Sequence, residues 1–306
     1  MLDTLTGFVV VGVAILVGYV LARIDLLGEH ARPVLSRLVF FVLSPFLLFT
    51  VLAHADATLL FSSLLPVSAI AAIAVIVLHT VIARFGWRRS VAETTIGALS
   101  AGQVNSNNIG LPLSLYLLGS AAFPAPVILM QLLVFTPISL TVLDAVTTER
   151  TSLRRTLTRT ATNPIIIGAL LGTLVSVTGM RLPDLVMAPA QLIADAAVPV
   201  LLISYGMSLH GQRVLGARGR RRDVLVASIL KLAVMPVIAW VLAQFVFGLT
   251  AQEVLIVTVL AALPTAQNVF NYSQRYDVGE AISRDTVFLT TIGCLPVLLL
   301  IMVLLG

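Results

Sequence analysis

One polar stretch inside an apolar segment decides how this sequence folds: Pro264-Thr265-Ala266-Gln267-Asn268-Val269-Phe270-Asn271. A similar stretch occurs earlier, as Asn105-Ser106-Asn107-Asn108-Ile109-Gly110-Leu111-Pro112. Each contains Asn-x-x-Asn at the same offset, since 268 − 105 = 163 and 271 − 108 = 163. Asparagine is unfavourable in hydrocarbon unless it is hydrogen-bonded. Polar, Pro/Gly-interrupted segments at matching places in two halves of a membrane protein are typical of the substrate site of a secondary transporter.

The composition predicts a membrane protein. The 306-residue chain is 58% hydrophobic and 11% charged, and its mean hydropathy is +1.05, whereas soluble domains carry about 25% charged residues. The single cysteine, Cys294, excludes an internal disulfide framework and a multi-cysteine metal site, and we expect neither a metal nor a cofactor. The pI near 10.0 comes from arginines spread over short loops. That distribution is typical of membrane proteins and predicts no nucleic-acid partner.

Apolar segments of roughly 20 residues are long enough to cross the hydrocarbon core of a bilayer. Counting them predicts an all-α polytopic protein of ten transmembrane helices with no soluble domain between them. The expected spans are 5–23, 33–53, 59–83, 92–118, 123–146, 162–179, 184–208, 224–247, 252–274 and 282–305.

Basic residues mark every second loop and predict the orientation. The loops after the first, third, fifth, seventh and ninth spans are rich in arginine, whereas the alternate loops carry only Arg181. Because cytoplasmic loops attract such charge, we expect both termini on the outer side of the cell (inner) membrane. Lys231, about two turns into the eighth span, is expected to snorkel to the cytoplasm. The run from Arg218 to Arg222 has lipid head-group binding as an alternative to a purely topological role.

A five-helix unit that is duplicated must insert its second copy upside down, because five is an odd number. The halves would be residues 1–148 and 161–306, joined by the most polar linker of the chain. Pro45 and Pro199 support the duplication, with an offset of 199 − 45 = 154 that differs from 163 through loop insertions. We therefore predict a five-plus-five inverted repeat.

The fourth and ninth spans are expected to unwind at their asparagines and to cross near the bilayer midplane. Each second half-helix would then present its N-terminus, where free N–H groups and the helix dipole favour an anion. Pro112 suits the first turn of a half-helix, and Pro264 removes a donor before the second break. Gly102 and Gly110 are expected to let the backbone bend.

Asparagine and glutamine side chains can bind a carboxylate without a fixed charge, because each amide offers both donors and acceptors. The alternative is that they only join helices through hydrogen bonds. Three ionisable groups are candidates for coupling, each with a structural alternative: Asp195 as a capped acid, Asp144 as a solvated one and His79 as an interfacial residue. The predicted substrate-binding residues are Asn105, Asn268, Asn107, Asn108, Asn271, Gln103, Gln267 and Gln131.

Three runs of this sequence carry a family resemblance that covers essentially the whole chain. They are Gly102 through Pro112, Leu263 through Tyr276, and Ala196 through Leu209, the last with the pattern Ala-x-Pro-x-x-Leu-x-x-x-Gly-x-x-Leu. With these runs the chain resembles the auxin efflux carrier family in its compact bacterial form. Plant members have an Asn-Pro-Asn-Thr-like break where this chain has Asn105-Ser106-Asn107-Asn108, so the local geometry is expected to differ.

The resemblance implies a fold like that of the sodium/bile-acid symporters. Helices 1, 2, 6 and 7 would form a scaffold and a homodimer surface, and helices 3–5 and 8–10 a moving transport domain. The family's crossover asparagines correspond to Asn105 and Asn268. Plant members transport an indole carboxylate, and bacterial relatives are linked to dicarboxylates such as malate or malonate.

We therefore expect a secondary transporter of small organic anions, elevator-like in mechanism and not an enzyme. Its coupling is open between uniport, proton symport and sodium symport. A nucleotide is not expected, because the sequence has no Gly-x-x-x-x-Gly-Lys-Ser/Thr loop. An anion channel, or a receptor or sensor built on a transporter fold, are the alternatives. Exchange stimulation of flux separates a transporter from a channel.

The orientation yields a labelling prediction. Cysteines introduced one at a time into residues 218–222 should be shielded from impermeant thiol reagents in intact cells, because this loop is expected to be cytoplasmic. Cysteines replacing Ala55 or Ala122 should be labelled, with the unaltered protein as the background for Cys294. The opposite pattern would reverse the orientation.

Overall fold

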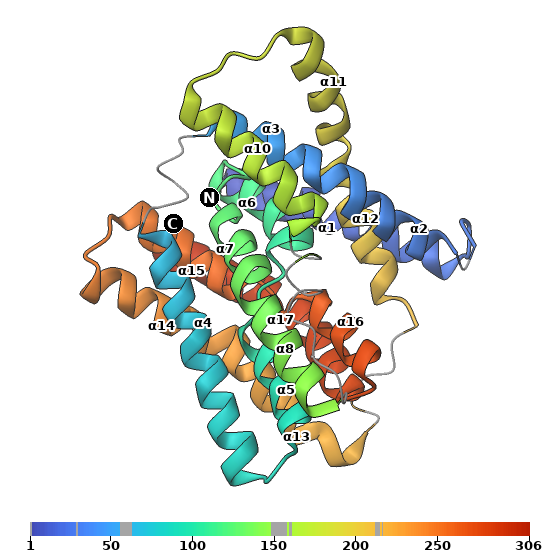
Figure 1. The fold of residues 1–306 in the computed structure, drawn as a ribbon, viewed down its shortest axis with the longest axis vertical. Helices are drawn as coiled ribbons and strands as arrows, with labels where there is room; N and C mark the ends of the chain where they lie inside the picture. Colours follow the sequence, from blue (N-terminus) through green and yellow to red (C-terminus); the bar gives the residue numbers. More distant parts are fainter. Residues whose placement is uncertain are drawn as a thin grey trace. The chain divides into compact units, whose positions relative to one another are not determined.

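The computed structural model describes residues 2–28, 30–55, 63–147, 158, 161–211, 215 and 217–306. Within these ranges the elements are helices joined by turns and short connections (Figure 1). The β-type pairing found in the same ranges is an isolated antiparallel bridge between Val104 and Thr265. The expected all-helical class is confirmed.

Six helices are long and apolar enough to cross a membrane, which agrees with the predicted multi-pass protein. Three further apolar helices are shorter, at Val9–Arg23, Pro164–Thr178 and Ala251–Ala262, so the count of ten spans remains a prediction. The six long helices are Pro33–His54, Leu64–Gly86, Ala125–Thr147, Asp184–Met207, Arg221–Val246 and Glu280–Leu305.

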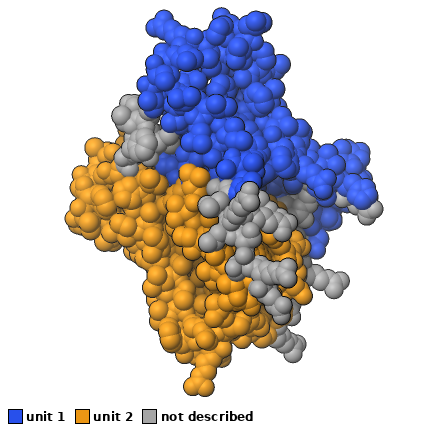
Figure 2. All heavy atoms as spheres, viewed as in Figure 1, with its two compact units in different colours: residues 1–62, 107–129, 158–212 blue, residues 63–106, 130–157, 213–306 orange. Residues whose placement is uncertain are grey.

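The chain forms two compact units, and each combines residues from both halves of the sequence. Unit 1 holds residues 1–62, 107–129 and 158–212, and unit 2 holds residues 63–106, 130–157 and 213–306 (Figure 2). The compact units are therefore different from the predicted repeats, which remain a prediction at the level of sequence. The expected fourth span is divided between the units after Ser106.

Unit 1 is organised around two closely packed helix pairs, α1 with α12 and α3 with α10. Asn163 begins α10 by accepting a hydrogen bond from the Ile165 N–H at 2.9 Å, and Pro164 follows at the first helical position. The helices of this unit are α1 (Leu2–Arg23), α2 (Ala31–Leu38), α3 (Ser44–His54), α6 (Leu111–Leu118), most of α7 (Ala125–Met130), α10 (Pro164–Thr178), α11 (Asp184–Asp195) and α12 (Ala197–Leu209), with the π-helical turn η1 (Val39–Leu43) before α3.

Glycines bring these helix pairs into backbone contact. A Cβ atom at Gly18 of α1 would overlap the carbonyl group of Ile203 in α12, and one at Gly206 of α12 would overlap that of Ile15. A Cβ atom at Gly168 of α10 would likewise overlap the carbonyl group of Pro45 in α3. Small residues allow such close approach, which replaces the hydrophobic effect as the source of packing energy in a membrane.

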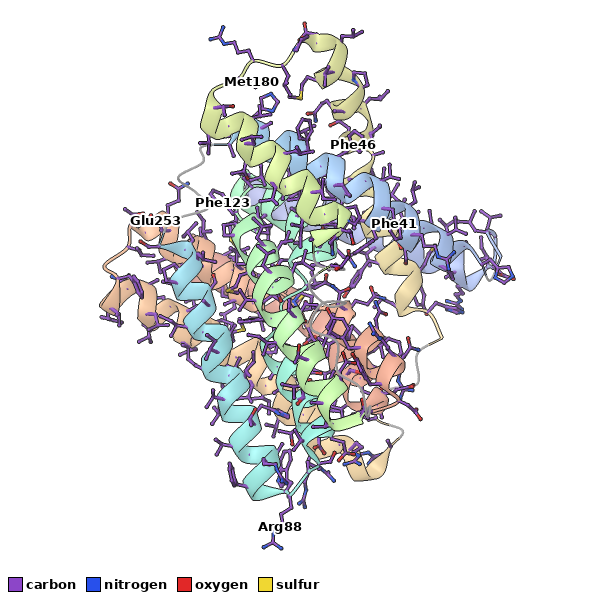
Figure 3. The ribbon with its side chains drawn as sticks, in the orientation of Figure 1. Phe41, Phe46, Arg88, Phe123, Met180 and Glu253 are labelled. Carbon is purple, nitrogen blue, oxygen red and sulfur yellow. The ribbon has the colours of Figure 1, made fainter. Side chains whose placement is uncertain are left out.

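Large apolar side chains remain exposed on unit 1, as expected for surfaces that face lipid. Phe41 is 61% exposed and Met180 56% exposed, and both are labelled with Phe46 in Figure 3.

Unit 2 contains the paired helices α4 and α5, and α14 and α15, together with the long helix α17. Its elements are α4 (Leu64–Val81), η3 (Ile82–Gly86), α5 (Val91–Gly102), η5 (Gln131–Phe135), α8 (Thr136–Thr147), η6 (Arg218–Arg220), α13 (Arg221–Ile229), η7 (Leu230–Val234), α14 (Met235–Val241), η8 (Leu242–Val246), α15 (Ala251–Ala262), α16 (Gln267–Tyr276) and α17 (Glu280–Leu305). The π-helical turn η4 (Ser106–Gly110) begins at its boundary.

The connections α4–α5 and α14–α15 have the same construction. Each helix ends in a π-helical turn, η3 or η8, followed by one residue with positive φ: Arg88 at 55° and Gly248 at 58° (Figure 3 labels Arg88). The numbering offset is constant, since 242 − 82 = 160 and 248 − 88 = 160. A residue in the left-handed region turns the chain sharply, so the next helix starts at once.

The following helices also start alike. Ser90 caps α5 and Thr250 caps α15, each accepting a hydrogen bond from the N–H of a glutamate three residues on, Glu93 or Glu253. In α15 the Glu253 carboxylate also accepts from the Thr250 N–H at 2.9 Å, which completes a capping box. The offset is again 250 − 90 = 160.

This offset is an alternative to the 163 that the two asparagine stretches predict. At 160 residues, Asn108 corresponds to Asn268 and Asn105 to Thr265. The offset of 160 describes the capped starts of α5 and α15, and the offset of 163 from Asn-x-x-Asn stays a prediction.

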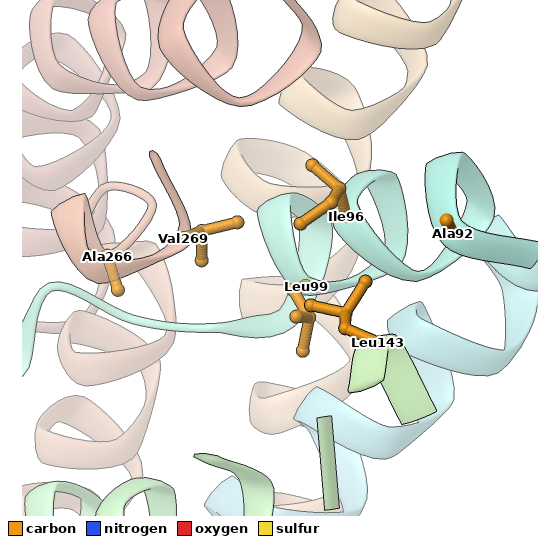
Figure 4. Packing of buried hydrophobic residues seen from close by; sticks show 6 residues of the cluster. All are labelled: Ala92, Ile96, Leu99, Leu143, Ala266 and Val269. Carbon is orange, nitrogen blue, oxygen red and sulfur yellow. The ribbon is translucent and has the colours of Figure 1, made fainter. Parts of the chain in front are cut away.

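A cluster of buried apolar side chains fixes α16 against α5 and α8 within unit 2. Figure 4 shows Ile96 and Leu99 of α5 with Leu143 of α8 and Val269 of α16. Ile96, Leu143 and Val269 are each 0% exposed. The start of α16, where two of the predicted site residues lie, is therefore held by packing as well as by hydrogen bonds.

The close approach of α1 to α12 yields a prediction with a control in the same helix. Gly18→Ala should destabilise the protein by about 1–3 kcal/mol, because the added methyl meets the backbone of Ile203. Gly12→Ala, where a Cβ would meet nothing within 4 Å, should be neutral or up to about 1 kcal/mol stabilising. Thermal unfolding in detergent would measure both, and equal melting temperatures for the two variants would contradict the packing argument.

Candidate functional site

Two helices of unit 2 stop in the middle of apolar sequence, and the chain beyond each one crosses the other. Helix α5 ends at Gly102 and α15 at Ala262. The Asn105 N–H donates to the Pro264 carbonyl at 2.8 Å, and the Ala266 N–H donates to the Gln103 carbonyl at 3.0 Å. We name residues 103–105 and 263–266 the crossover. Pro264 explains the second stop, because it lacks an N–H group and holds the preceding residue in an extended conformation.

The Gln131 side chain hydrogen-bonds the first segment of the crossover, residues 103–105. Its Oε1 accepts from the Val104 N–H at 2.7 Å, and its Nε2 donates to the Val104 carbonyl at 3.0 Å. A longer bond of 3.4 Å joins Nε2 to the Ser106 hydroxyl. The predicted substrate-binding amide of Gln131 is therefore occupied by backbone, and its role in binding stays a prediction.

Threonine hydroxyl groups form hydrogen bonds at the second segment of the crossover, residues 263–266. The Thr265 N–H donates to the Thr290 hydroxyl of α17 at 3.0 Å. The Thr265 hydroxyl in turn donates to the Ser100 carbonyl at 2.6 Å, in the last turn of α5. Carbonyls in a last helical turn have no partner within the helix, so Thr265 satisfies one end of the interrupted helix from the other side of the crossover.

Lys231 contradicts its predicted position. It was expected to reach the cytoplasm, yet its side chain is 0% exposed in the π-helical turn η7. Its Nζ donates to the Ala261 carbonyl at 2.6 Å and to Met235 Sδ at 3.2 Å. The carbonyl at the end of α15 holds the ammonium inside unit 2. The sequence sets Lys231 apart from the arginines of the loops, because it is the only lysine among the 19 lysine and arginine residues.

Besides Gln131, the predicted binding residues of unit 2 lie at the crossover and in α16. Asn105 is 4% exposed and Gln103 2% exposed. The Gln103 Nε2 is buried and has no hydrogen-bond partner among the described residues. Gln267 begins α16 and is half-buried, and Asn268 and Asn271 are on its exposed side.

Asn107 and Asn108 belong to unit 1. The Asn107 amide donates to the Ser44 hydroxyl of α3 at 3.2 Å and to Asn108 Oδ1 at 3.0 Å. This arrangement agrees with the alternative that these asparagines join helices through hydrogen bonds.

The predicted hinge residues differ in what they do. A Cβ at Gly102 would overlap the Ile76 side chain and approach the Ala72 carbonyl at 3.0 Å, so Gly102 lets α5 pack against α4. Gly110 has φ −64° and ψ −45°, which are helical values open to any residue. Its role in bending the backbone stays a prediction. Pro112 lies in the first turn of α6, as expected.

The three candidates for coupling are dispersed. Asp195 ends α11 in unit 1, where it is exposed and accepts from Gln191 Nε2 at 2.6 Å. Asp144 accepts from the Tyr276 hydroxyl at 2.7 Å, which joins α8 to α16. His79 is 1% exposed, and Gly97 of α5 makes room for its ring.

Ion pairs hold the start of α5 to α13. Arg89 donates through Nε and Nη2 to both carboxylate oxygens of Asp223, at 3.0 and 2.7 Å, and this bond raises the pKa of the Arg89 guanidinium. Arg220 pairs with Glu93. Arginines of the basic loops thus also connect elements of unit 2. Among the described residues, no group of histidine, cysteine and acidic side chains could hold a metal ion.

The long apolar helices and the interrupted pair define a multi-pass membrane protein. The profile of a family described as membrane transport protein matches residues 4–302, and the chain therefore belongs to this auxin efflux carrier-like family. An uncharacterized transporter of Methanothermobacter thermautotrophicus (strain ATCC 29096 / DSM 1053 / JCM 10044 / NBRC 100330 / Delta H) is 26% identical over 284 residues, which cover 92% of this chain and 91% of that protein.

The brace at Val104 can be tested by substitution. Gln131→Leu should destabilise the protein by roughly 1–3 kcal/mol for each backbone group it leaves buried and unpaired. Gln244→Leu, at an exposed position of η8, should change stability by less than about 0.5 kcal/mol. Thermal unfolding of both variants would measure the difference. A loss of ligand affinity in Gln131→Leu with unchanged stability would instead favour direct substrate contact.

Proposed function

We propose that this protein is a secondary transporter of small organic anions that works by alternating access around the crossover. The observation that carries the proposal is the meeting of two interrupted helices within unit 2, at residues rich in amides. Interrupted helices supply the binding site in many secondary transporters, because their free ends and unwound backbone offer polar groups inside the membrane.

An anion fits the polar groups on offer. Helix α16 starts directly after the crossover, and its N-terminus carries partial positive charge. The buried Gln103 Nε2 adds a donor that the described residues leave unused. The crossover itself contains no acidic residue. A carboxylate accepting from such donors forms charge-assisted hydrogen bonds without a fixed partner charge to slow its release.

The substrates we propose are indole-acetate-like or malate/malonate-like carboxylates. The coupling is uniport, proton symport or sodium symport, with Asp195, Asp144 and His79 as candidate groups.

We also propose that the chain is an inverted repeat in an elevator-type homodimer of the inner membrane, with extracytoplasmic termini. The matched construction of α4–α5 and α14–α15 supports a duplication, because turn, cap and helix length recur at one offset of 160 residues. Unit 1, with the expected helices 1, 2, 6 and 7 and residues 107–129, would supply the dimer surface. Unit 2 would carry the substrate.

The proposal predicts the effect of removing one amide of the crossover and one at the start of α16. Asn105→Ala and Asn268→Ala should each weaken ligand binding about ten- to hundred-fold, because a hydrogen bond to a charged group contributes about 1.5–3 kcal/mol. Binding of indole-acetate, malate and malonate to the purified protein, measured by thermal shift and then titrated, would test this and identify the preferred class.

An asparagine with a structural task provides the control. Asn163→Ala removes the cap of α10 and should lower the melting temperature while leaving affinity intact. If Asn105→Ala and Asn268→Ala behave in the same way, the amides only hold helices together. Aspartate at either position should bind worse than alanine through charge repulsion, and preserved or improved transport by the aspartate variants would point to a cation instead.

A further inference from the structure

Lys231 is a buried basic group that the proposed anion site does not use. Among the described residues it is the largest fully buried side chain, and it lies in a π-helical turn, a feature frequent at functional sites. Burying a charged ammonium is unfavourable by several kcal/mol unless other groups compensate it. Among the described residues, the ion pairs are Arg89–Asp223, Arg220–Glu93 and Arg284–Asp285, and none of them includes Lys231.

The compensation comes from the end of α15. Inside a continuous helix the Ala261 carbonyl would accept from the N–H four residues on, at Thr265. Here the Thr265 N–H donates to the Thr290 hydroxyl instead, and Lys231 Nζ takes its place at 2.6 Å. The C-terminal end of a helix carries partial negative charge, which favours a cation.

The other interrupted helix is completed without charge. The end of α5 receives the neutral Thr265 hydroxyl on the Ser100 carbonyl. At the offset of 160, the position that corresponds to Lys231 is Ala71, since 231 − 160 = 71. The cation therefore bonds only one of the two matched helix ends. If such a helix end needed a cation for structural reasons alone, both ends would have one.

In secondary transporters, unwound carbonyls and the C-terminal ends of half-helices coordinate the coupling cation. An ammonium group and Na⁺ are both monovalent and both bind carbonyl oxygen. We propose that Lys231 Nζ permanently occupies a cation position at the end of α15, so that unit 2 carries its own positive charge and transport needs no sodium. The transport consequence rests on the proposed function, whereas occupation of the cation position does not.

The first test uses purified protein without substrate, so that it is readable even if the organic-anion proposal fails. The melting temperature of the unaltered protein should be the same in sodium chloride and in choline chloride. Lys231→Ala should melt lower and recover saturably with Na⁺ or methylammonium, because a small cation can enter the vacated position. Saturable stabilisation of the unaltered protein by Na⁺ over choline, or a Lys231→Ala protein that responds to neither cation, would overturn the proposal.

A second variant separates charge from volume and covers the case in which Lys231→Ala does not fold. Lys231→Met fills similar space without charge and should respond to neither cation. In liposomes its exchange of the ligand found by thermal shift should fall about ten-fold or more, in line with one lost charged hydrogen bond. Lys231→Arg, which keeps the charge, should retain exchange that is equal in sodium and in choline. Exchange by Lys231→Met at the unaltered rate would show that the charge is dispensable and would refute the proposal.

Discussion

Backbone N–H and C=O groups must find partners where water is scarce, and this constraint shapes the whole of unit 2. A continuous helix meets it internally, but α5 and α15 end inside apolar sequence and leave their last carbonyls and the following residues unpaired. The partners come from far along the chain: Gln131 for Val104, Thr265 for Ser100, and Lys231 for Ala261. The polar side chains nearest the crossover are thus largely occupied by hydrogen bonds to its backbone and to the adjoining helix ends.

The elements around the crossover are placed by equally local rules. Positive-φ turns and Ser or Thr caps fix where α5 and α15 begin. Tyr272 and Tyr276 bond Thr136 and Asp144, and these bonds set α16 against α8 alongside the apolar cluster at Val269. Since a shift of about 1 Å can spoil a binding site, the amides near α16 depend on such supports as much as on their own chemistry.

The interruptions could be located from the sequence because proline removes a backbone donor and asparagine needs hydrogen-bond partners inside an apolar run. The partners could not be assigned, because the bonds from Gln131 to Val104 and from Lys231 to Ala261 bridge 27 and 30 residues and leave no local pattern. For the same reason the sequence predicts a cytoplasmic end for Lys231, and it does not reveal the bonds from Gln131 to the backbone. The offset of 163 follows the asparagine side chains, whereas the offset of 160 follows the capped helix starts.

The short antiparallel pairing at the crossover has an evolutionary consequence. Residues 103–105 and 264–266 exchange two backbone hydrogen bonds, from the Asn105 N–H to the Pro264 carbonyl and from the Ala266 N–H to the Gln103 carbonyl. Under the proposed duplication, an ancestral half-length chain would have needed a second, oppositely inserted copy to complete these bonds. Fusion of two copies into one polypeptide would then have freed each to diverge, so that one could gain a lysine where the other kept an alanine.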